Sequence, residues 1–133
     1  MSYMLDTDTC IYIIKENPPT VINALKSHAI NDICISAITL AELNYGVEKS
    51  RLVEKNRMAL LNFLAPFEIL PFTSSASVSY GKIRAFLEKN GQTIGPYDML
   101  IAAHALSESM SLVTNNTKEF MRIPDLSIFN WTE

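Results

Sequence analysis

Short apolar runs alternate along this 133-residue chain with longer stretches in which apolar residues recur at helical spacing. The clearest helical stretch covers residues 75–90, where Ala76, Ile83 and Leu87 fall on one face. Strands that alternate with helices form a parallel sheet whose two faces are covered by helices. The sequence therefore predicts an α/β fold, as a single domain over residues 1–133. The five predicted strands are residues 3–5, 33–35, 68–72, 111–114 and 126–129.

Glycine and proline mark the ends of two predicted helices. Gly91 follows the stretch 75–90, where a C-terminal glycine is expected. Pro96 begins the predicted helix 97–109, where the amide that proline lacks is not needed. Active sites of parallel α/β sheets collect at the carboxyl ends of the strands, near a reversal of strand order. The polar residues that follow the predicted strands are therefore the candidates for function.

The composition excludes several classes of protein. With 48% hydrophobic and 19% charged residues, the chain is neither disordered nor fibrous. Its net charge of −3 gives no overall positive field, so an RNA or DNA partner needs a local basic patch and a bound divalent metal ion. The longest apolar runs, residues 10–14 and 99–103, fall far short of the roughly 20 residues of a membrane span.

The cysteines and the first residues favour a reducing cytoplasm. Cys10 and Cys34 lie within apolar segments and lack the spacing of metal ligands, as expected of buried thiols. Residues 1–6 contain no basic segment, and no long apolar stretch follows them, which is unlike a signal peptide.

Two aspartates follow the first predicted strand. Asp6 comes directly after its last apolar residue, and Asp8 precedes an apolar helical run that starts near Thr9. Asp8 or Thr9 can cap that helix, and for Asp8 capping and a functional role are equally good interpretations. For Asp6 we favour a functional role over capping.

Glu42 lies in the apolar stretch 38–43 after the second strand, where a carboxylate is costly to bury without a cationic partner. One interpretation is a capping box with Thr39. Ser36 is the better N-cap candidate because it follows the strand directly. That assignment moves Glu42 to the second turn and favours a functional role.

Asp98 stands in the first turn of the predicted helix 97–109, a position that the helix dipole favours whatever the function. Together with Asp6 and Glu42, it occupies corresponding places after strands or at helix starts. Converging carboxylates repel one another unless a divalent cation neutralises them. A set of oxygen ligands suits Mg²⁺ or Mn²⁺, and acidic clusters that bind such ions typically catalyse phosphodiester chemistry.

With these residues identified, the chain resembles PIN-domain ribonucleases and, more closely, the VapC-type toxins of bacterial toxin–antitoxin pairs. The matching stretches are residues 4–7, 35–46, 94–98, 112–120 and 130–131, in the expected order over nearly the whole chain. The resemblance implies a three-layer α/β/α sandwich with a central parallel sheet, whose carboxylates bind Mg²⁺ or Mn²⁺ and cut RNA.

The resemblance also implies roles for individual residues. Asp6, Glu42 and Asp98 map onto the family's acidic positions, with Asp6 and Asp98 as direct metal ligands. Glu119 falls near the fourth acidic position, and Asn116 falls where other members carry Asp, so either residue can complete the site.

Three further positions beside the metal are notable. Thr7 and Thr114 match hydroxyl positions expected to orient carboxylates or a water molecule. Asp8 is a departure, because close relatives usually carry Asn there; it either adds a ligand or weakens the site by repulsion.

The implied function is that of a toxin that cleaves RNA, with the anticodon region of initiator tRNA as the favoured target. The implied partners are a cognate VapB-type antitoxin and a second toxin copy within the complex, with operator DNA bound only through the antitoxin. Possible RNA-contacting surfaces are Lys49, Arg51, Lys55 and Arg57, although interleaved glutamates favour ion pairs on a solvated helix.

Two alternatives remain at this stage. A catalytically decayed PIN-like domain would bind RNA or protein without cutting, which the retention of three of the four acids disfavours. The residues Asp6-Thr7-Asp8 after a strand also resemble haloacid-dehalogenase-type phosphatases. However, Cys10 stands where that motif requires Thr or Val, and the chain has no room for the usual cap insertion.

Overall fold

A computed structural model describes residues 2–133 and contains one five-stranded sheet with the strand order β3-β2-β1-β4-β5. Every neighbouring pair of strands is parallel. The α/β class and the central parallel sheet are therefore confirmed. The strands are β1 (Tyr3–Leu5), β2 (Ile33–Ser36), β3 (Glu68–Leu70), β4 (Ser111–Val113) and β5 (Ile128–Phe129).

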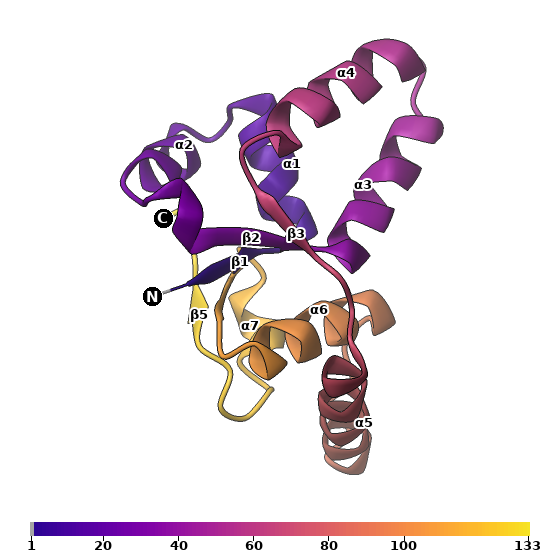
Figure 1. The fold of residues 1–133 in the computed structure, drawn as a ribbon. Helices are drawn as coiled ribbons and strands as arrows, with labels where there is room; N and C mark the ends of the chain where they lie inside the picture. The colour runs from indigo at the N-terminus through magenta and orange to yellow at the C-terminus, as the bar shows by residue number, and fades with distance from the viewer. Residues whose placement is uncertain (1) are drawn as a thin grey trace.

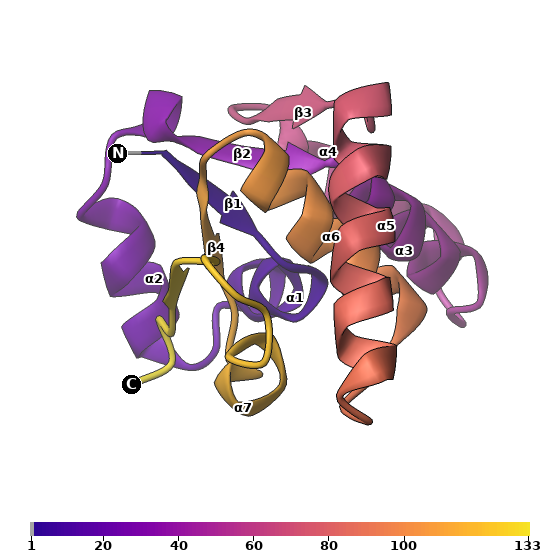
Figure 2. The same cartoon turned by 90° about the horizontal axis from the view of Figure 1, so that it is seen from below.

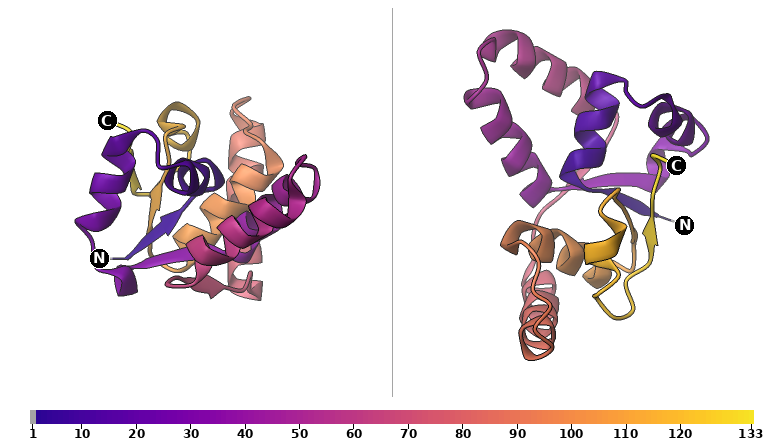
Figure 3. Two further views of the ribbon diagram at one scale, coloured as in Figure 1. Left: turned by 90° about the horizontal axis from the view of Figure 1, so that it is seen from above. Right: turned by 180° about the vertical axis from the view of Figure 1, so that it is seen from behind.

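Helices cover both faces of the sheet and complete the three layers (Figure 1). One face carries α1 (Thr7–Lys15), α2 (Pro19–Lys26), α3 (Ala37–Glu48) and α4 (Val53–Leu64). The other carries α5 (Ser74–Lys89), α6 (Pro96–Ser107) and α7 (Thr117–Phe120), which lie in front of the sheet in Figure 2. A short 3-10 helix, Ile30–Asp32, precedes β2. Figure 3 shows the same separation of the two helical layers from above and from behind.

Successive residues of a strand point to opposite faces of the sheet, so the buried side chains form two hydrophobic clusters, one on each face. Leu5 and Ile35 pack with the helices α1 to α4, whereas Met4, Cys34 and Leu112 pack with α5 to α7. These side chains are buried in the interior. Continuous burial of this kind on both faces is typical of parallel strands.

Most helix ends follow the expected signals. Ser36 caps α3 by accepting a hydrogen bond from the backbone N–H of Ile38, and Pro96 is the first residue of α6. Gly91 follows α5 with a φ of 64°, a left-handed conformation that glycine adopts without strain. Three strands are shorter than expected: β3 ends at Leu70, β4 ends one residue before Thr114, and β5 contains only Ile128–Phe129.

The expected cap of the first helix is wrong. The helix α1 begins at Thr7, not near Thr9, and its N-cap is Asp6, whose side chain accepts a hydrogen bond from the backbone N–H of Thr9. Asp8 lies inside the first turn and is exposed. Asp6 is the N-cap because it is the last residue with extended backbone before α1. Its carboxylate therefore lies over the free amides of the first turn.

The strand order fixes where a site can form. The chain builds outward from β1 through β2 to β3, then returns to add β4 and β5 on the other side of β1. Helix α1 and the turn after β4 therefore diverge at the carboxyl end of β1. This reversal of strand order is the place where ligands bind in open parallel sheets. No helix within residues 2–133 is long and apolar enough to cross a membrane.

Candidate active site

Asp6 lies at this reversal of strand order and is fixed by its surroundings. Its backbone N–H donates to the carbonyl oxygen of Val113 at 3.0 Å, and its Oδ1 accepts from the Thr9 N–H at 2.9 Å. The side chain is only 5% exposed. Burial raises the pKa of Asp6, and hydrogen bonds from Thr114 and Thr9 partly offset this effect.

Two threonines frame Asp6 from neighbouring elements. The hydroxyl of Thr9 donates to the carbonyl oxygen of Val113 at 3.2 Å, which ties α1 to the end of β4. Thr114 is fully buried, and its hydroxyl also accepts the Asn116 N–H at 3.0 Å. The Thr114 side chain is a hydrogen-bond partner of the Asp6 carboxylate, and its expected place beside a metal ion stays a prediction. Thr9 was considered only as a cap, because a threonine in a helical run carries no other signal.

Glu42 approaches the same point from α3. It lies in the second turn of this helix and is half-buried, so the capping-box interpretation with Thr39 does not apply. Its Oε1 accepts a hydrogen bond of 2.6 Å from the hydroxyl of Thr7, the first residue of α1. This bond holds the Glu42 carboxylate beside the N-terminus of α1. Its donor, Thr7, directly follows Asp6 in the chain.

Asp98 completes the convergence from the other helical layer. It is half-buried in the first turn of α6, where its Oδ2 lies 3.5 Å from the position of a Cβ on Gly95. Its pKa is raised to about 6, first by burial and then by nearby negative charges. The charges that act on it belong to Asp6, Glu42, Glu119 and Asp8.

Five carboxyl groups therefore share one electrostatic environment. None of the ion pairs within residues 2–133 neutralises them, because those pairs join Arg57 to Glu48 and Glu54, and Arg84 to Glu88. Glu119 lies in the first turn of α7 and acts on Asp98 more strongly than Asp8 does. Asn116 is the N-cap residue of α7, and its side chain makes no capping bond.

A buried histidine links the two layers behind these carboxylates. His104 of α6 is fully buried, and its Nδ1 lies 2.7 Å from the hydroxyl oxygen of Ser36, the cap of α3. Burial lowers the pKa of His104, which keeps the ring neutral at pH 7. The apolar residues on either side of His104 in the stretch 101–106 are a sequence signal of this burial.

The donor set fits a divalent ion in its chemistry. It consists of carboxylate oxygens that repel one another, and Mg²⁺ or Mn²⁺ favours such ligands. No three His, Cys, Asp or Glu side chains in the described part of the chain are grouped so as to hold an ion directly. An ion at this place would therefore have to be held by fewer side chains, as Mg²⁺ can be, because it commonly keeps several water molecules.

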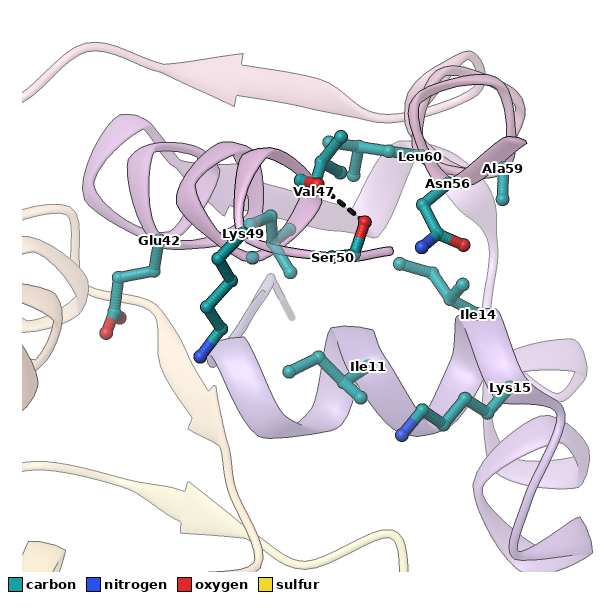
Figure 4. Close-up of a pocket in the computed structure, with 12 residues that line it drawn as sticks. Ile11, Ile14, Lys15, Glu42, Val47, Lys49, Ser50, Asn56, Ala59 and Leu60 are labelled. Atoms are coloured by element: carbon teal, nitrogen blue, oxygen red, sulfur yellow. Dashed lines mark hydrogen bonds between the residues drawn. The ribbon is translucent and has the colours of Figure 1, made fainter. Parts of the chain in front are cut away.

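Two cavities adjoin the carboxylates along α3. The first, of about 380 Å³, lies between α1, α3 and α4 and reaches the acids only through Glu42 (Figure 4). The second, of about 550 Å³, is lined by Thr7 and Glu42 together with Tyr45 and Tyr97. A substrate phosphate at the carboxylates would therefore have open space beside it.

Comparison with known proteins identifies the family to which the chain belongs. The model of the PIN domain matches residues 3–126. The chain therefore belongs to the PIN-domain family.

Individual relatives narrow this assignment. Ribonuclease VapC2 of Rickettsia felis is 48% identical over 132 residues, which cover 98% of each chain. The tRNA(fMet)-specific endonuclease VapC of Salmonella typhimurium is 42% identical over 131 residues, again with 98% of both chains covered. A crystal structure of VapBC2 from Rickettsia felis, bound to a DNA fragment from its promoter, contains a chain that matches with a TM-score of 0.93 and 47% identity. The match covers 98% of this chain and 99% of that one. Within the PIN-domain family, the protein is thus one of the VapC ribonucleases.

Proposed function

We propose that this VapC ribonuclease is a Mg²⁺- or Mn²⁺-dependent endoribonuclease that cleaves tRNA, with the anticodon region of initiator tRNA as its target, and so inhibits translation. The observation that supports metal dependence is the approach of Glu42 to the N-terminus of α1 beside Asp6, with Asp98 close enough that burial and then the charges of four other acids raise its pKa to about 6. Such repulsion at a reversal of strand order is a disadvantage for folding and an advantage for cation binding. The tRNA target is supported by the name of the Salmonella typhimurium relative.

In this proposal Asp6 and Asp98 hold the ion, and Glu42 acts directly or through a water molecule. When bound, the ion would lower the pKa of an attacking water and stabilise charge on the scissile phosphate. The chain supplies the positioning. Thr9 and Thr114 fix the Asp6 carboxylate, and Thr7 fixes Glu42. Glu119 adds negative charge on the side of α7, which makes it the better candidate than Asn116 for the fourth acidic position.

The test is cleavage of purified tRNA. Total tRNA and initiator tRNA are incubated with the protein and Mg²⁺ or Mn²⁺, and the fragments are separated on a gel. We expect discrete fragments that disappear with EDTA and with Asp98→Asn. Asp125→Asn is the matched control, because Asp125 is exposed and its backbone φ of 67° suits Asn. Full cleavage by Asp98→Asn, after contaminating nucleases are excluded, would refute the assignment of the site.

Other outcomes identify the alternatives. Turnover of a small phosphate ester such as p-nitrophenyl phosphate would indicate a phosphatase. Failure to bind Mn²⁺ would indicate a decayed domain. If Mn²⁺ binds but tRNA stays intact, Asp8→Asn in the same assay distinguishes a site weakened by Asp8 from a different RNA target.

We further propose that a VapB-type antitoxin binds and inhibits this protein, that two toxin copies occur in the complex, and that operator DNA is bound through the antitoxin. The matched chain of VapBC2 from Rickettsia felis supports this, because it comes from a complex bound to promoter DNA. Free buried thiols at Cys10 and Cys34 support a reducing cytoplasm. Adding the antitoxin should suppress cleavage, and light scattering should give the mass of a complex with two toxin chains.

A further inference from the structure

Two tyrosine rings beside the carboxylates are unexpectedly exposed. Tyr45 of α3 is 65% exposed and Tyr97 of α6 is 59% exposed, although burial of an aromatic ring is usually favourable. Both residues line the 550 Å³ cavity that also contains Thr7 and Glu42. Because Glu42 lines the same cavity, both rings lie near the carboxylates at which a substrate phosphate would react in the proposed function.

The face of α3 that carries Tyr45 presents a carboxylate, an aromatic ring and an ammonium group in sequence along the chain. Glu42, Tyr45, Gly46 and Lys49 are spaced three, four and seven residues along the helix, which places them on one side. Figure 4 shows that the side chains of Glu42 and Lys49 extend from the same side of α3. A Cβ on Gly46 would meet no atom within 4 Å, so the space between the two side chains is open.

Lys49 supplies a positive charge at the far end of this face. Its Nζ lies 5.1 Å from the centroid of the Tyr45 ring. It takes part in none of the ion pairs formed within residues 2–133. An aromatic ring beside an uncompensated lysine is the combination that binds a base and its neighbouring phosphate in single-stranded nucleic acids.

We propose that Tyr45 and Tyr97 stack against unpaired bases next to the scissile phosphate of the RNA, and that Lys49 binds a neighbouring phosphate. The inference rests on the proposed ribonuclease function and specifies the form of its substrate. Bases within a double helix have both faces covered by their neighbours, whereas bases in a loop can be splayed out onto aromatic side chains. The substrate is therefore a strand that is unpaired at the cut.

RNA is favoured over a protein partner by two features of the cavity. It is lined by Glu42, one of the carboxylates at which the reacting phosphate lies in the proposed function, and by Thr7, which donates a hydrogen bond to Glu42. It also has Lys49 in its wall, a charge that complements a phosphodiester strand.

Steady-state cleavage of the RNA that the wild-type protein cuts provides the first test. The variants are Tyr45→Leu and Tyr97→Leu, each paired with the corresponding Phe substitution. We expect each Leu variant to lower kcat/KM about tenfold, mainly through KM, and each Phe variant to restore it to within about twofold. Phe86→Leu on α5 is the matched control, because this ring is 42% exposed and lines neither of the two cavities. Circular dichroism verifies that the variants are folded.

A binding measurement separates this inference from the proposed function. An RNA oligonucleotide with 2-aminopurine in a single-stranded segment is titrated with Asp98→Asn protein, and quenching of its fluorescence reports stacking. We expect quenching with this parent and with added Phe substitutions, and little with added Leu substitutions. Lys49→Gln should reduce the salt dependence of binding by about 0.7 in the slope of log K against log salt.

The outcomes are distinct. If the wild-type protein cuts no RNA but quenching depends on the tyrosines, the ribonuclease function fails and the stacking site stands. If the Leu variants cut and quench like their parents, stacking is overturned while the ribonuclease function stands. If they lose only binding to the antitoxin, the tyrosines form a protein-docking surface and the inference is wrong.

Discussion

Asp6 and Asp98 stand on opposite sides of the same site and are held in different ways. Asp6 is buried at the end of β1 and accepts hydrogen bonds from Thr9 and Thr114. Asp98 is half-buried on α6, and no residue within 2–133 donates a hydrogen bond to its carboxylate. Its pKa is raised to about 6 by burial and by four other acids.

The two aspartates of this cluster therefore differ in how much the fold depends on them. Asp6 serves the fold as the cap of α1, so replacing it has a structural consequence. Asp98 caps no helix, and its charge is disfavoured by burial and by the repulsion of the other four acids, which costs stability at neutral pH. Variants that affect one aspartate or the connection between them can therefore test this division.

The largest effect on stability is expected at the hydrogen bond between His104 of α6 and Ser36 at the start of α3, which joins the two helical layers. His104→Ala removes a fully buried ring and its hydrogen bond to Ser36, so the free energy of unfolding should fall by about 2–4 kcal/mol. Ser36→Ala keeps the ring but removes both the cap of α3 and the hydrogen bond to His104, and should cost about 1–2 kcal/mol. Urea denaturation measures both. Equal losses for the two variants would show that the histidine ring itself contributes nothing.

A smaller effect distinguishes the two roles of Asp6. Asp6→Ala loses the capping bond to Thr9 and should destabilise the protein by about 1–2 kcal/mol. Asp6→Asn keeps a side-chain acceptor at the cap, so its stability should remain within about 0.5 kcal/mol of the wild type. Both should lose RNA cleavage, because an amide does not replace a carboxylate ligand. The prediction fails if denaturation curves show both variants to be equally unstable.

Asp98→Asn should do the opposite and stabilise the metal-free protein. The raised pKa of Asp98 means that its charged form is disfavoured in the folded state. Removing that charge should add roughly 1 kcal/mol at pH 7, a value reduced from the full shift because solvent screens a half-exposed group. Thermal unfolding in EDTA measures this gain, and an excess of Mn²⁺ should stabilise the wild type more than the variant.

The sign of the pH dependence follows from the same shift. A carboxyl group with a raised folded-state pKa binds protons more tightly in the folded than in the unfolded protein. The advantage of Asp98→Asn should therefore be complete at pH 7 and shrink as the pH falls through about 6 toward the ordinary value of 3.8. His104 acts in the other direction, because a lowered pKa makes the protein lose stability as the pH falls below 6.5. A constant advantage from pH 7 to pH 4 would contradict the assigned shift.

Sequence reasoning anticipated most of this fold for identifiable reasons. The apolar runs at β1, β2 and β4 are buried on both faces, so they are visible without knowledge of their partners. The signals of Gly91, Pro96 and Ser36 are local and were confirmed. The cap of α1 was misjudged, because Asp6 and Asp8, two positions apart, both suit the N-cap, and only the path of the chain after β1 selects Asp6.

The convergence of Asp6, Glu42 and Asp98 was predicted from their places after strands or at helix starts, without knowledge of the contacts between them. The hydrogen bonds that position them could not. Thr7 meets Glu42 across 35 residues, and His104 meets Ser36 across 68, so neither pair has a signature in a local pattern. Exposure of Tyr45 and Tyr97 is likewise a property of the folded surface.

The smallest effect concerns Asp8, the acid that departs from the family's usual residue. Among the charges that raise the pKa of Asp98, those of Asp6, Glu42 and Glu119 act more strongly than that of Asp8, which is exposed and screened by water. Asp8→Asn should therefore lower the Asp98 pKa least, and Glu119→Gln should lower it more. Carbon-13 NMR titration of the carboxyl groups, in EDTA and at low salt, measures these shifts, with Asp125→Asn as the control. If Asp8→Asn instead produced the larger decrease, Asp8 would lie closer to Asp98 in solution than Glu119 does, and its role as a ligand would replace that of Glu119.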